Sequence, residues 1–292
     1  MDNLLIVDLN HLIYRFGARY FNGYISEIGV ISSINRSINK IKDYLNNPKV
    51  VIVADSQCPS RKEFYNELLK IQEGYKEGRQ REDNWNTLDS AVRESLSKQY
   101  SYLRVFNYEA DDLITSIVDF YKESTINKYI LTIDADILPL VDEKTSVFLF
   151  RNKKTEYTVG KYVLFTKDNF SKRVNILSSF SAKGITLNNF LLIKMLIGDK
   201  SDNIPRVAKH TPKNISDFLK WSNIDKNYKW SYFESEESIK KELEKIILNP
   251  KEVTQALNNY KLMKMNSDLG GRRKPFTISS ELLNEKGNHT FN

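Results

Sequence analysis

The sequence predicts an α/β protein in which a mostly parallel central sheet is flanked by helices. Three short apolar segments that each end in an aspartate are typical of buried parallel strands: Leu4–Asp8, Val50–Asp55 and Tyr129–Asp134. Between them, the apolar residues of Ile34–Leu45 and Asp111–Phe120 recur at helical spacing. This alternation of strand and helix predicts right-handed crossovers within one sheet.

The aspartates that end these segments, Asp8, Asp55 and Asp134, share one expected location. Each follows a strand at its carboxyl end, and open parallel sheets bind their ligands at that edge. A single acid after a strand is commonly a loop residue or a helix cap. Three acids along one edge favour a binding site over that alternative.

With 292 residues, the chain is long enough for one large domain or two modest ones. We expect an α/β core over residues 1–187 and a mainly helical region over residues 188–292, because the apolar spacing turns helical from about Asn188. Residues after about Asp268 are expected to form a loosely held tail. Its basic segment Arg272–Lys274 is either a solvated terminus or a contact to a partner.

The charge balance favours an anionic partner, because 44 Lys and Arg face 37 Asp and Glu, a formal charge of +7. The single cysteine, Cys58, excludes an intramolecular disulfide and a zinc site built from cysteines. The three histidines are too dispersed for a zinc motif, so a bound metal is expected to be a hard cation held by oxygen. No secretory signal and no apolar segment of about 20 residues is evident, so we expect an intracellular chain without a membrane partner.

Residues 61–104 differ from the flanking sequence, because cationic and aromatic residues are interleaved there. These residues are Arg61, Lys62, Lys70, Lys76, Arg79 and Arg81 with Phe64, Tyr65, Tyr75 and Trp85. Such a mixture suits phosphate contacts together with base stacking. A solvated pair of amphipathic helices with i,i+4 charge pairs is the alternative.

Further acids gather in three short motifs. Tyr108–Asp112 reads YEADD before an apolar helical segment, and three acids in four residues exceed what a helix cap uses. Ile133–Asp136 reads IDAD after a strand, and Gly198–Asn203 reads GDKSDN after an apolar helix. Taken alone, IDAD also fits an ordinary loop, and GDKSDN also fits a turn that ends a helix.

If these acids converge, their mutual repulsion requires bound cations. The nine acids are Asp8, Asp55, Glu109, Asp111, Asp112, Asp134, Asp136, Asp199 and Asp202. Oxygen ligands without soft donors select Mg²⁺ or Mn²⁺. Two such ions about 3.5–4 Å apart activate a water and stabilise the leaving oxygen of a phosphodiester, so the pattern indicates a nuclease.

The motifs resemble, in order and spacing, those of the 5′-nuclease family of flap endonucleases and 5′→3′ exonucleases, over about residues 4–206. The segments that carry the resemblance are IVDLN, VADS, YEADD, TIDAD and GDKSDNIP. The similarity is greatest to bacteriophage members such as the RNase H of T-even phages. It implies the fold described above, with a helical arch over about residues 61–104 and a helical C-terminal region that binds DNA.

The resemblance also implies roles for single residues. One metal subsite would comprise Asp55, Glu109, Asp111 and Asp112 with Asp8 near it, and the second Asp134, Asp136, Asp199 and Asp202. Tyr75–Arg79 resembles a segment that contacts the scissile phosphate, so Lys76 and Arg79 are the expected catalytic cations, with Lys70 as the alternative to Lys76. Expected contacts to nucleic acid are Arg61, Lys62, Lys70, Tyr75 and Arg81.

After Asn203 the chain departs from the family pattern. The segment IPRVAKHTPKNISDF lacks the glycine-rich helix-hairpin-helix turn with which the family grips duplex DNA. Arg206, Lys209 and Lys213, or a partner protein, would have to supply that grip. The departure leaves substrate preference open without affecting the metal site.

The function that follows is a metal-dependent 5′-nuclease that uses two Mg²⁺ ions, replaceable by Mn²⁺, near the 5′ end of branched or nicked DNA or RNA–DNA. Removal of RNA primers is one such reaction. A replication polymerase or a single-strand-binding protein is the expected protein partner of a monomer in the cytoplasm, that of a host cell if the chain is phage-encoded. The alternatives are a PIN-like ribonuclease, which Asp199 and Asp202 count against, and a DNA-binding relative without catalysis, which the complete acid set counts against.

Overall fold

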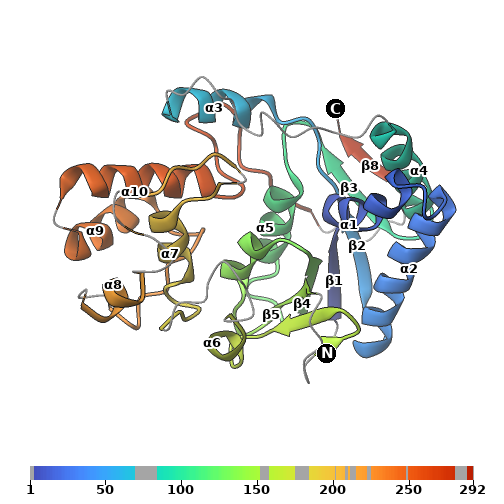
Figure 1. Ribbon diagram of the computed structural model, residues 1–292, viewed down its shortest axis with the longest axis horizontal. Coiled ribbons are helices and arrows are strands. Elements are labelled where there is room, and N and C mark those ends of the chain that lie inside the picture. The colour runs from blue at the N-terminus through green and yellow to red at the C-terminus, as the bar shows by residue number, and fades with distance from the viewer. Residues whose placement is uncertain are drawn as a thin grey trace.

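Strand β1 (Asn3–Asp8) lies inside a mostly parallel sheet, between β4 (Asn127–Thr132) and β2 (Lys49–Val53) (Figure 1). Beyond β4 comes β5 (Thr145–Phe150), and beyond β2 comes β3 (Ser101–Val105). All of these neighbours pair in parallel. The apolar segments form strands because their side chains are buried on both faces, as in a sheet covered by helices.

The computed structural model describes residues 3–69, 84–151, 158–174, 184–200, 202–207, 210, 215–221, 225–247, 249–279 and 288–291. Over these residues the sheet has eight strands in the order β6-β7-β5-β4-β1-β2-β3-β8. The short strands β6 (Thr158–Val159) and β7 (Tyr162–Phe165) form an antiparallel hairpin on β5. At the other edge, β8 (Asn288–Phe291) pairs in parallel with β3. The predicted fold class is confirmed.

Helices α1 (Leu9–Phe21), α2 (Glu27–Tyr44) and α4 (Trp85–Ser97) cover one face of the sheet (Figure 1). Helix α5 (Ala110–Phe120) and the 3-10 helix η1 (Ala135–Leu140) cover the opposite face. Alternate residues of β1 contribute to the two cores, as the period of a strand requires. Helix α3 (Pro59–Leu69) precedes the gap before α4, and the short helix α6 (Phe170–Arg173) follows β7.

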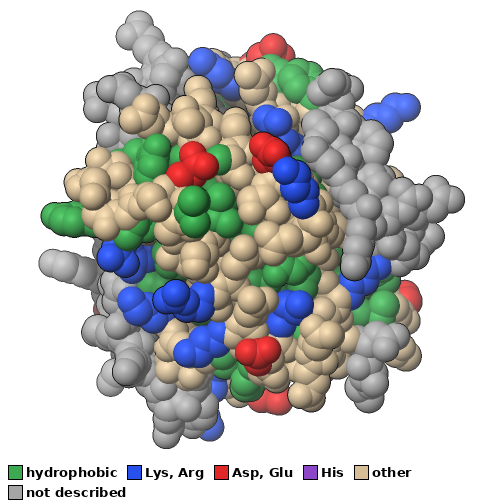
Figure 2. All heavy atoms as spheres, turned by 90° about the vertical axis from the view of Figure 1, so that its right-hand side faces the viewer, with side chains coloured by type: hydrophobic (Ala, Val, Ile, Leu, Met, Phe, Trp, Pro, Cys, Tyr) green, Lys and Arg blue, Asp and Glu red, His purple; other side chains and the backbone are tan. Residues whose placement is uncertain are grey.

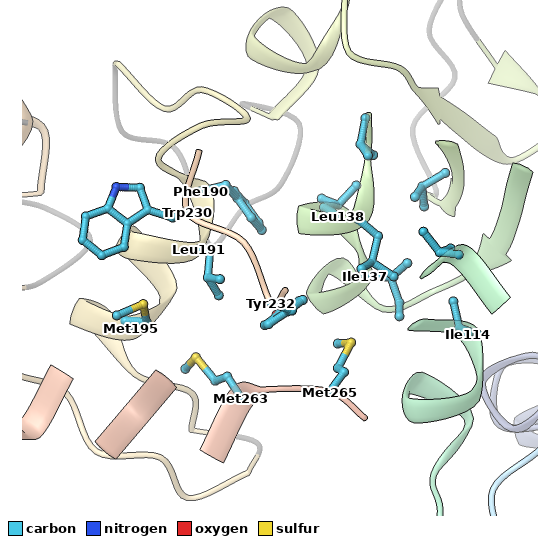
Figure 3. Close-up of a cluster of buried hydrophobic side chains, with 14 of the residues drawn as sticks. Ile114, Ile137, Leu138, Phe190, Leu191, Met195, Trp230, Tyr232, Met263 and Met265 are labelled. Carbon is cyan, nitrogen blue, oxygen red and sulfur yellow. The ribbon is translucent and has the colours of Figure 1, made fainter. Parts of the chain in front are cut away.

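The C-terminal region is helical, with α7 (Phe190–Ile197), α8 (Ile215–Trp221), α9 (Glu236–Ile246) and α10 (Pro250–Met263). Its core is continuous with the core beneath the sheet. Figure 3 shows Met195, Trp230 and Met263 on the helical side of a cluster that extends through Tyr232 to Ile137 of η1. The boundary after residue 187 stays a prediction, and the two regions share buried side chains across it.

Two expectations about segments are wrong. The region 61–104 does not continue as an arch to Arg104, because Ser101–Val105 is the buried strand β3. Residues beyond Asp268 are not loosely held up to residue 279, because Arg273 and Ile278 are buried. The sequence left the role of the basic segment Arg272–Lys274 open, because Asp112, the buried partner of Arg273, lies far away in the sequence.

In the described residues, no helix has the length and apolar character that crossing a membrane requires.

Candidate metal centre

A cavity of about 300 Å³ opens at the carboxyl-terminal edge of the sheet. Eight of the nine predicted acids line it: Asp8, Asp55, Glu109, Asp111, Asp134, Asp136, Asp199 and Asp202. We call this cavity the acidic pocket. Residues nearly two hundred positions apart in sequence therefore meet at one place, as the strand-end pattern predicts.

The parallel sheet is what brings the first acids together. Asp8 is the last residue of β1, Asp55 follows β2 by two residues, and Asp134 follows β4 by two residues. Because β1 lies between β2 and β4, these three carboxylates flank one another along the edge. Asp111 joins them from the first turn of α5.

Asp8 occupies the N-cap position of α1, yet its side chain caps no backbone amide. Instead its carboxylate lies 2.5 Å from Nδ1 of His11 and accepts a hydrogen bond of 2.8 Å from the hydroxyl of Thr132. Nε2 of His11 lies 3.7 Å from Asp134. Although burial alone would lower the pKa of His11, Asp8 and Asp134 raise it well above its ordinary value. The capping alternative therefore does not account for Asp8.

Asp111 carries the clearest sign of crowded negative charge. Burial raises its pKa well above the ordinary value, and the charges of Asp134 and Asp8 raise it further, against the effect of His11. An aspartate whose ionised form is disfavoured by neighbouring carboxylates is stabilised by a bound cation. A position such as this suits a ligand of a divalent metal.

The second group of acids is arranged around one cation of the protein itself. Lys194 of α7 is buried, and its ammonium contacts Asp136 and lies 3.5 Å from Asp199. Burial and the charge of Asp134 raise the pKa of Asp136 to about 7, although Lys194 acts in the opposite direction. Burial would lower the pKa of Lys194, but Asp136 and Asp199 raise it, so Lys194 is charged.

The loop that carries Asp199 and Asp202 is a tight turn after α7 and not a continued helix. Gly198 ends the helix at φ 70° and ψ −171°, a region open almost only to glycine. The amide of Asp199 then donates to the carbonyl of Ile204, and the amide of Ile204 donates back. From α10, the buried amide of Asn259 donates to the carbonyls of Met195 and Pro205, both at 2.7 Å. These bonds fix the loop on both sides.

Asp112 is placed differently from the other predicted ligands. It is fully buried and does not line the acidic pocket. Its carboxylate lies 2.6 Å from the guanidinium of Arg61 and 2.9 Å from that of Arg273, and it accepts the amide of Asn266. Its role as a ligand stays a prediction, while its position is that of a counter-ion behind the pocket.

The predicted nucleic-acid contacts fall into two groups. Arg61 lines the pocket but is buried, with its Nε 3.3 Å from Glu109, so its charge serves the acids of the site. Lys62 and Arg206 are exposed. Lys70, Tyr75, Lys76, Arg79, Arg81, Lys209 and Lys213 lie outside the described residues.

Four further residues belong to the site and were not predicted from the sequence: His11, Asn10, Lys194 and Tyr14. Asn10 accepts the amide of Asp55 at 2.8 Å. Tyr14 lines the pocket with its side chain 62% exposed, and its ring lies 5.5 Å from that of Trp85. A lone lysine within the apolar segment FLLIKMLI, just before an acidic motif, is the signal that points to Lys194.

The donor set of the pocket fits hard divalent cations, because its ligands are carboxylates and it contains no thiol. In the described part of the chain, no group of three acidic, histidine or cysteine side chains already has the arrangement of a complete metal site. Protein cations lie among the carboxylates, as the contacts of His11 and Lys194 show.

A model of the N-terminal resolvase-like domain of 5′-3′ exonucleases matches residues 3–174, more than half of the 292 residues. The chain belongs to the 5′-3′ exonuclease family. The family resemblance of the acidic motifs is thereby confirmed, and with it the assignment to a class of nucleases. The matched range includes β1 to β7 and six of the eight acids that line the pocket. The other two, Asp199 and Asp202, lie beyond it in the loop after α7.

Two curated relatives illustrate the family. DNA polymerase I of Caldicellulosiruptor bescii is 29% identical over 232 residues, which are 77% of this chain and 25% of the polymerase. A 5′-3′ exonuclease of Buchnera aphidicola subsp. Acyrthosiphon pisum is 28% identical over 249 residues, 82% of this chain and 77% of the exonuclease. The chain thus spans a quarter of the polymerase and about three quarters of the stand-alone exonuclease.

Solved structures show the same fold. A bacteriophage T5 protein co-crystallised with metal ions has a TM-score of 0.63 and 17% identity, covering 97% of this chain and 96% of its own. The flap endonuclease of bacteriophage T5, in a pseudo-enzyme–product complex with DNA and metal ions, has a TM-score of 0.63 and 18% identity at the same coverage. At these identities the likeness concerns the fold, a mostly parallel sheet flanked by helices.

Proposed function

We propose that this protein is a divalent-metal-dependent 5′-nuclease that hydrolyses phosphodiesters near the 5′ end of branched or nicked DNA or RNA–DNA. The observation that carries the proposal is the convergence of eight carboxylates in one pocket. Family membership supports the reaction class, and the DNA and metal ions in the bacteriophage T5 structure support the substrate and the cofactor.

In this proposal the carboxylates hold two Mg²⁺ ions, which Mn²⁺ replaces. Asp8, Asp55, Glu109 and Asp111 serve the first ion, and Asp134, Asp136, Asp199 and Asp202 serve the second. When bound, such ions supply a nucleophilic water near neutral pH and neutralise charge on the leaving oxygen. Asp112 acts from behind, where it holds Arg61 and the first turn of α5 in place.

Other residues of the pocket would position the substrate. The exposed ring of Tyr14, supported by Trp85, offers a surface on which a base near the cut stacks. Lys76 and Arg79, outside the described residues, remain the proposed cations for the scissile phosphate. A polymerase or single-strand-binding partner, a bacteriophage origin and action in the cytoplasm belong to the same proposal, and the polymerase relative and the bacteriophage T5 structures support it.

The test compares cleavage of a 5′-labelled flap duplex in Mg²⁺ and in EDTA. We expect cutting near the branch only with metal. Asp134→Asn should reduce the rate at least about a hundredfold without weakening DNA binding, because it removes a metal ligand. The matched control is Asp119→Asn, an exposed aspartate at the far end of α5, which should leave the rate unchanged. Cleavage that survives in Asp134→Asn, or that proceeds in EDTA, would sink the proposal.

A further inference from the structure

A second cavity, of about 280 Å³, lies between α1, α2 and the β6–β7 hairpin. Five cations line it, and among the described residues no acidic side chain does: Arg15, Arg19, Arg36, Lys40 and Lys161. We call it the basic pocket. Figure 2 shows the side of the molecule on which α2 lies, and Lys and Arg side chains gather on the lower half of that face.

The positions of the charges in the basic pocket destabilise the two helices that carry them. Arg15 and Arg19 are four residues apart on α1, and Arg36 and Lys40 are four apart on α2, so each helix places two like charges side by side. Like-charged i,i+4 pairs destabilise a helix by about 0.2–0.5 kcal/mol each. Since α1 packs against α2, the two pairs also repel across the pocket.

Elsewhere the protein pairs its surface lysines in the opposite way. Lys98 bonds Glu94 on α4, and Lys241 bonds Glu237 on α9, both at i,i+4 spacing. Within the described part of the chain, no ion pair with an acid is formed by Arg19, Arg36, Lys40 or Lys161. An ordinary solvated helix face would mix the two signs, so this arrangement points to an anionic ligand.

The floor of the basic pocket consists of aromatic rings and one buried hydroxyl. The guanidinium of Arg15 lies 4.3 Å from the centre of the Phe150 ring, which fixes its orientation. The Tyr162 side chain is 3% exposed, and its hydroxyl interacts with that of Ser37, which also lines the pocket. The turn at Gly160 brings Lys40 over this floor. A phosphate oxygen in the pocket would accept a hydrogen bond from this hydroxyl in place of Ser37.

The basic pocket and the acidic pocket lie on the same edge of the sheet. Phe150 ends β5 and pairs with Tyr162, and β5 is two strands from β1, which ends in Asp8. Two strand spacings are about 10 Å. One strand of B-DNA spans that distance with about three successive phosphates. A strand that reaches the acidic pocket is therefore long enough to reach the basic one.

We propose that the basic pocket binds phosphates of the nucleic-acid strand whose scissile bond lies in the acidic pocket. Of this proposal, only the position of the scissile bond in the acidic pocket rests on the proposed function. The same phosphate chemistry is available from a free nucleotide, and the experiments below separate the two sources.

The first experiment measures DNA affinity in EDTA at several salt concentrations, where no metal-dependent cleavage occurs. Arg19→Gln/Arg36→Gln removes two exposed charges, one from each helix. Since each phosphate contact contributes about 0.9 to the slope of log K against log salt, we expect the slope to fall by about 1.8. Lys240→Gln/Lys241→Gln on α9 is the control with the same loss of charge. Equal slopes for the two variants overturn the proposal.

The second experiment uses Tyr162→Phe, which removes one hydroxyl and no charge. We expect DNA binding about fivefold weaker, the size of one hydrogen bond, with the salt slope unchanged. Unchanged affinity would mean that no phosphate contacts the Tyr162 hydroxyl at the pocket floor, and it would overturn the proposal. Thermal unfolding of the same variant checks that the fold is intact, because the change removes only the interaction of this hydroxyl with Ser37.

A calorimetric titration with dAMP in EDTA addresses the other source of phosphate. If dAMP binds the wild type and not Arg19→Gln/Arg36→Gln, while the salt slope for DNA is the same in both, the ligand is a free nucleotide and the proposal is overturned. A wild type that does not cleave in Mg²⁺, yet loses salt slope in the variant, contradicts the proposed function and leaves the phosphate site standing.

Discussion

At the scale of single residues, Asp111 shows most directly how the acidic pocket lowers the stability of the metal-free protein. Its pKa is raised by burial and by Asp134 and Asp8, so the folded state favours its protonated form. The folded-state pKa therefore exceeds the unfolded one, and the free energy of unfolding decreases as the pH rises through the folded-state value. Burying the Asp111 carboxyl at this crowded site therefore lowers the free energy of unfolding at neutral pH compared with an uncharged side chain.

We therefore expect Asp111→Asn to raise the melting temperature in EDTA at pH 7.5, by about 2–4 °C per kcal/mol of repulsion removed. The advantage should shrink as the pH falls, because the wild-type carboxyl then binds its proton. Calorimetry at pH 5 and 7.5 measures both effects. Asp119→Asn on the same helix is exposed and should shift neither value. A lower melting temperature for Asp111→Asn in EDTA at pH 7.5 would contradict this explanation.

Bound metal should reverse the order of the melting temperatures of the wild type and Asp111→Asn. A ligand that binds only the folded state stabilises it by an amount that grows with its concentration over its dissociation constant. Mg²⁺ should therefore raise the melting temperature of the wild type, and raise that of Asp111→Asn less. Equal shifts in the two proteins would mean that Asp111 is not a ligand.

Residue types and spacing were enough to predict which acids meet, because the end of a parallel strand has one position in a sheet. They were not enough for the cations. Lys194 reaches Asp136 only because α7 packs beside η1. This packing is a tertiary contact that no local sequence pattern predicts. The burial of Arg61 beside Asp112 could not be predicted for the same reason, since Asp112 is distant in the chain, and the contact of Arg61 to nucleic acid stays a prediction.

At the scale of elements, the turn after α7 depends on one glycine. A Cβ on Gly198 would lie 2.5 Å from the carbonyl oxygen of Ile204, across the bridge that closes the Asp199 loop. Gly198→Ala should lower the free energy of unfolding by at least about 3 kcal/mol and weaken metal-dependent cleavage, because both the backbone angle and the close contact are violated.

The control for this change is Gly23→Ala. Gly23 also has a positive φ, 72°, but a Cβ there would meet nothing within 4 Å. Its cost should be only the backbone term, about 1–2 kcal/mol. Urea unfolding of both variants gives the comparison, and equal losses would show that the contact with Ile204 is unimportant.

Elements with a simple pattern were predictable and the others were not. The apolar segments of β1, β2 and β4 are recognisable as strands from the sequence. Strand β6 is too short for a pattern because it has two residues, and β3 is obscured because it follows a charged segment. The helix over Asp111–Phe120 was placed within one residue of α5. The motif GDKSDN was also compatible with a turn that ends a helix, and the positive φ of Gly198 shows that it forms one.

At the scale of the whole molecule, the segment after α10 ties the helical region to the sheet. Arg273 is 8% exposed, pairs with Asp112 at 2.9 Å and donates to the carbonyls of Asn107 and Ser267. Arg273→Met should therefore lower the free energy of unfolding by about 3 kcal/mol, because it removes one partner of a buried ion pair.

The adjacent residue provides the matched control. Arg272 pairs with Glu67, whose side chain is 72% exposed, so Arg272→Met should cost about 0–1 kcal/mol. Chemical unfolding of the two variants side by side measures the difference. If both cost the same, the segment is held by its apolar contacts and not by the pair of Arg273 with Asp112.

The pairing of β8 with β3 has a consequence for biosynthesis. Tyr102 lies opposite Asn288, so the partner strand leaves the ribosome 186 residues later. Translation proceeds at about 5–20 residues per second, so the outer edge of β3 lacks its partner strand for roughly 10–40 s after β3 is synthesised. An open parallel edge is a template for other chains during that interval. The nascent protein would therefore depend most on chaperone cover while its helical half is being translated.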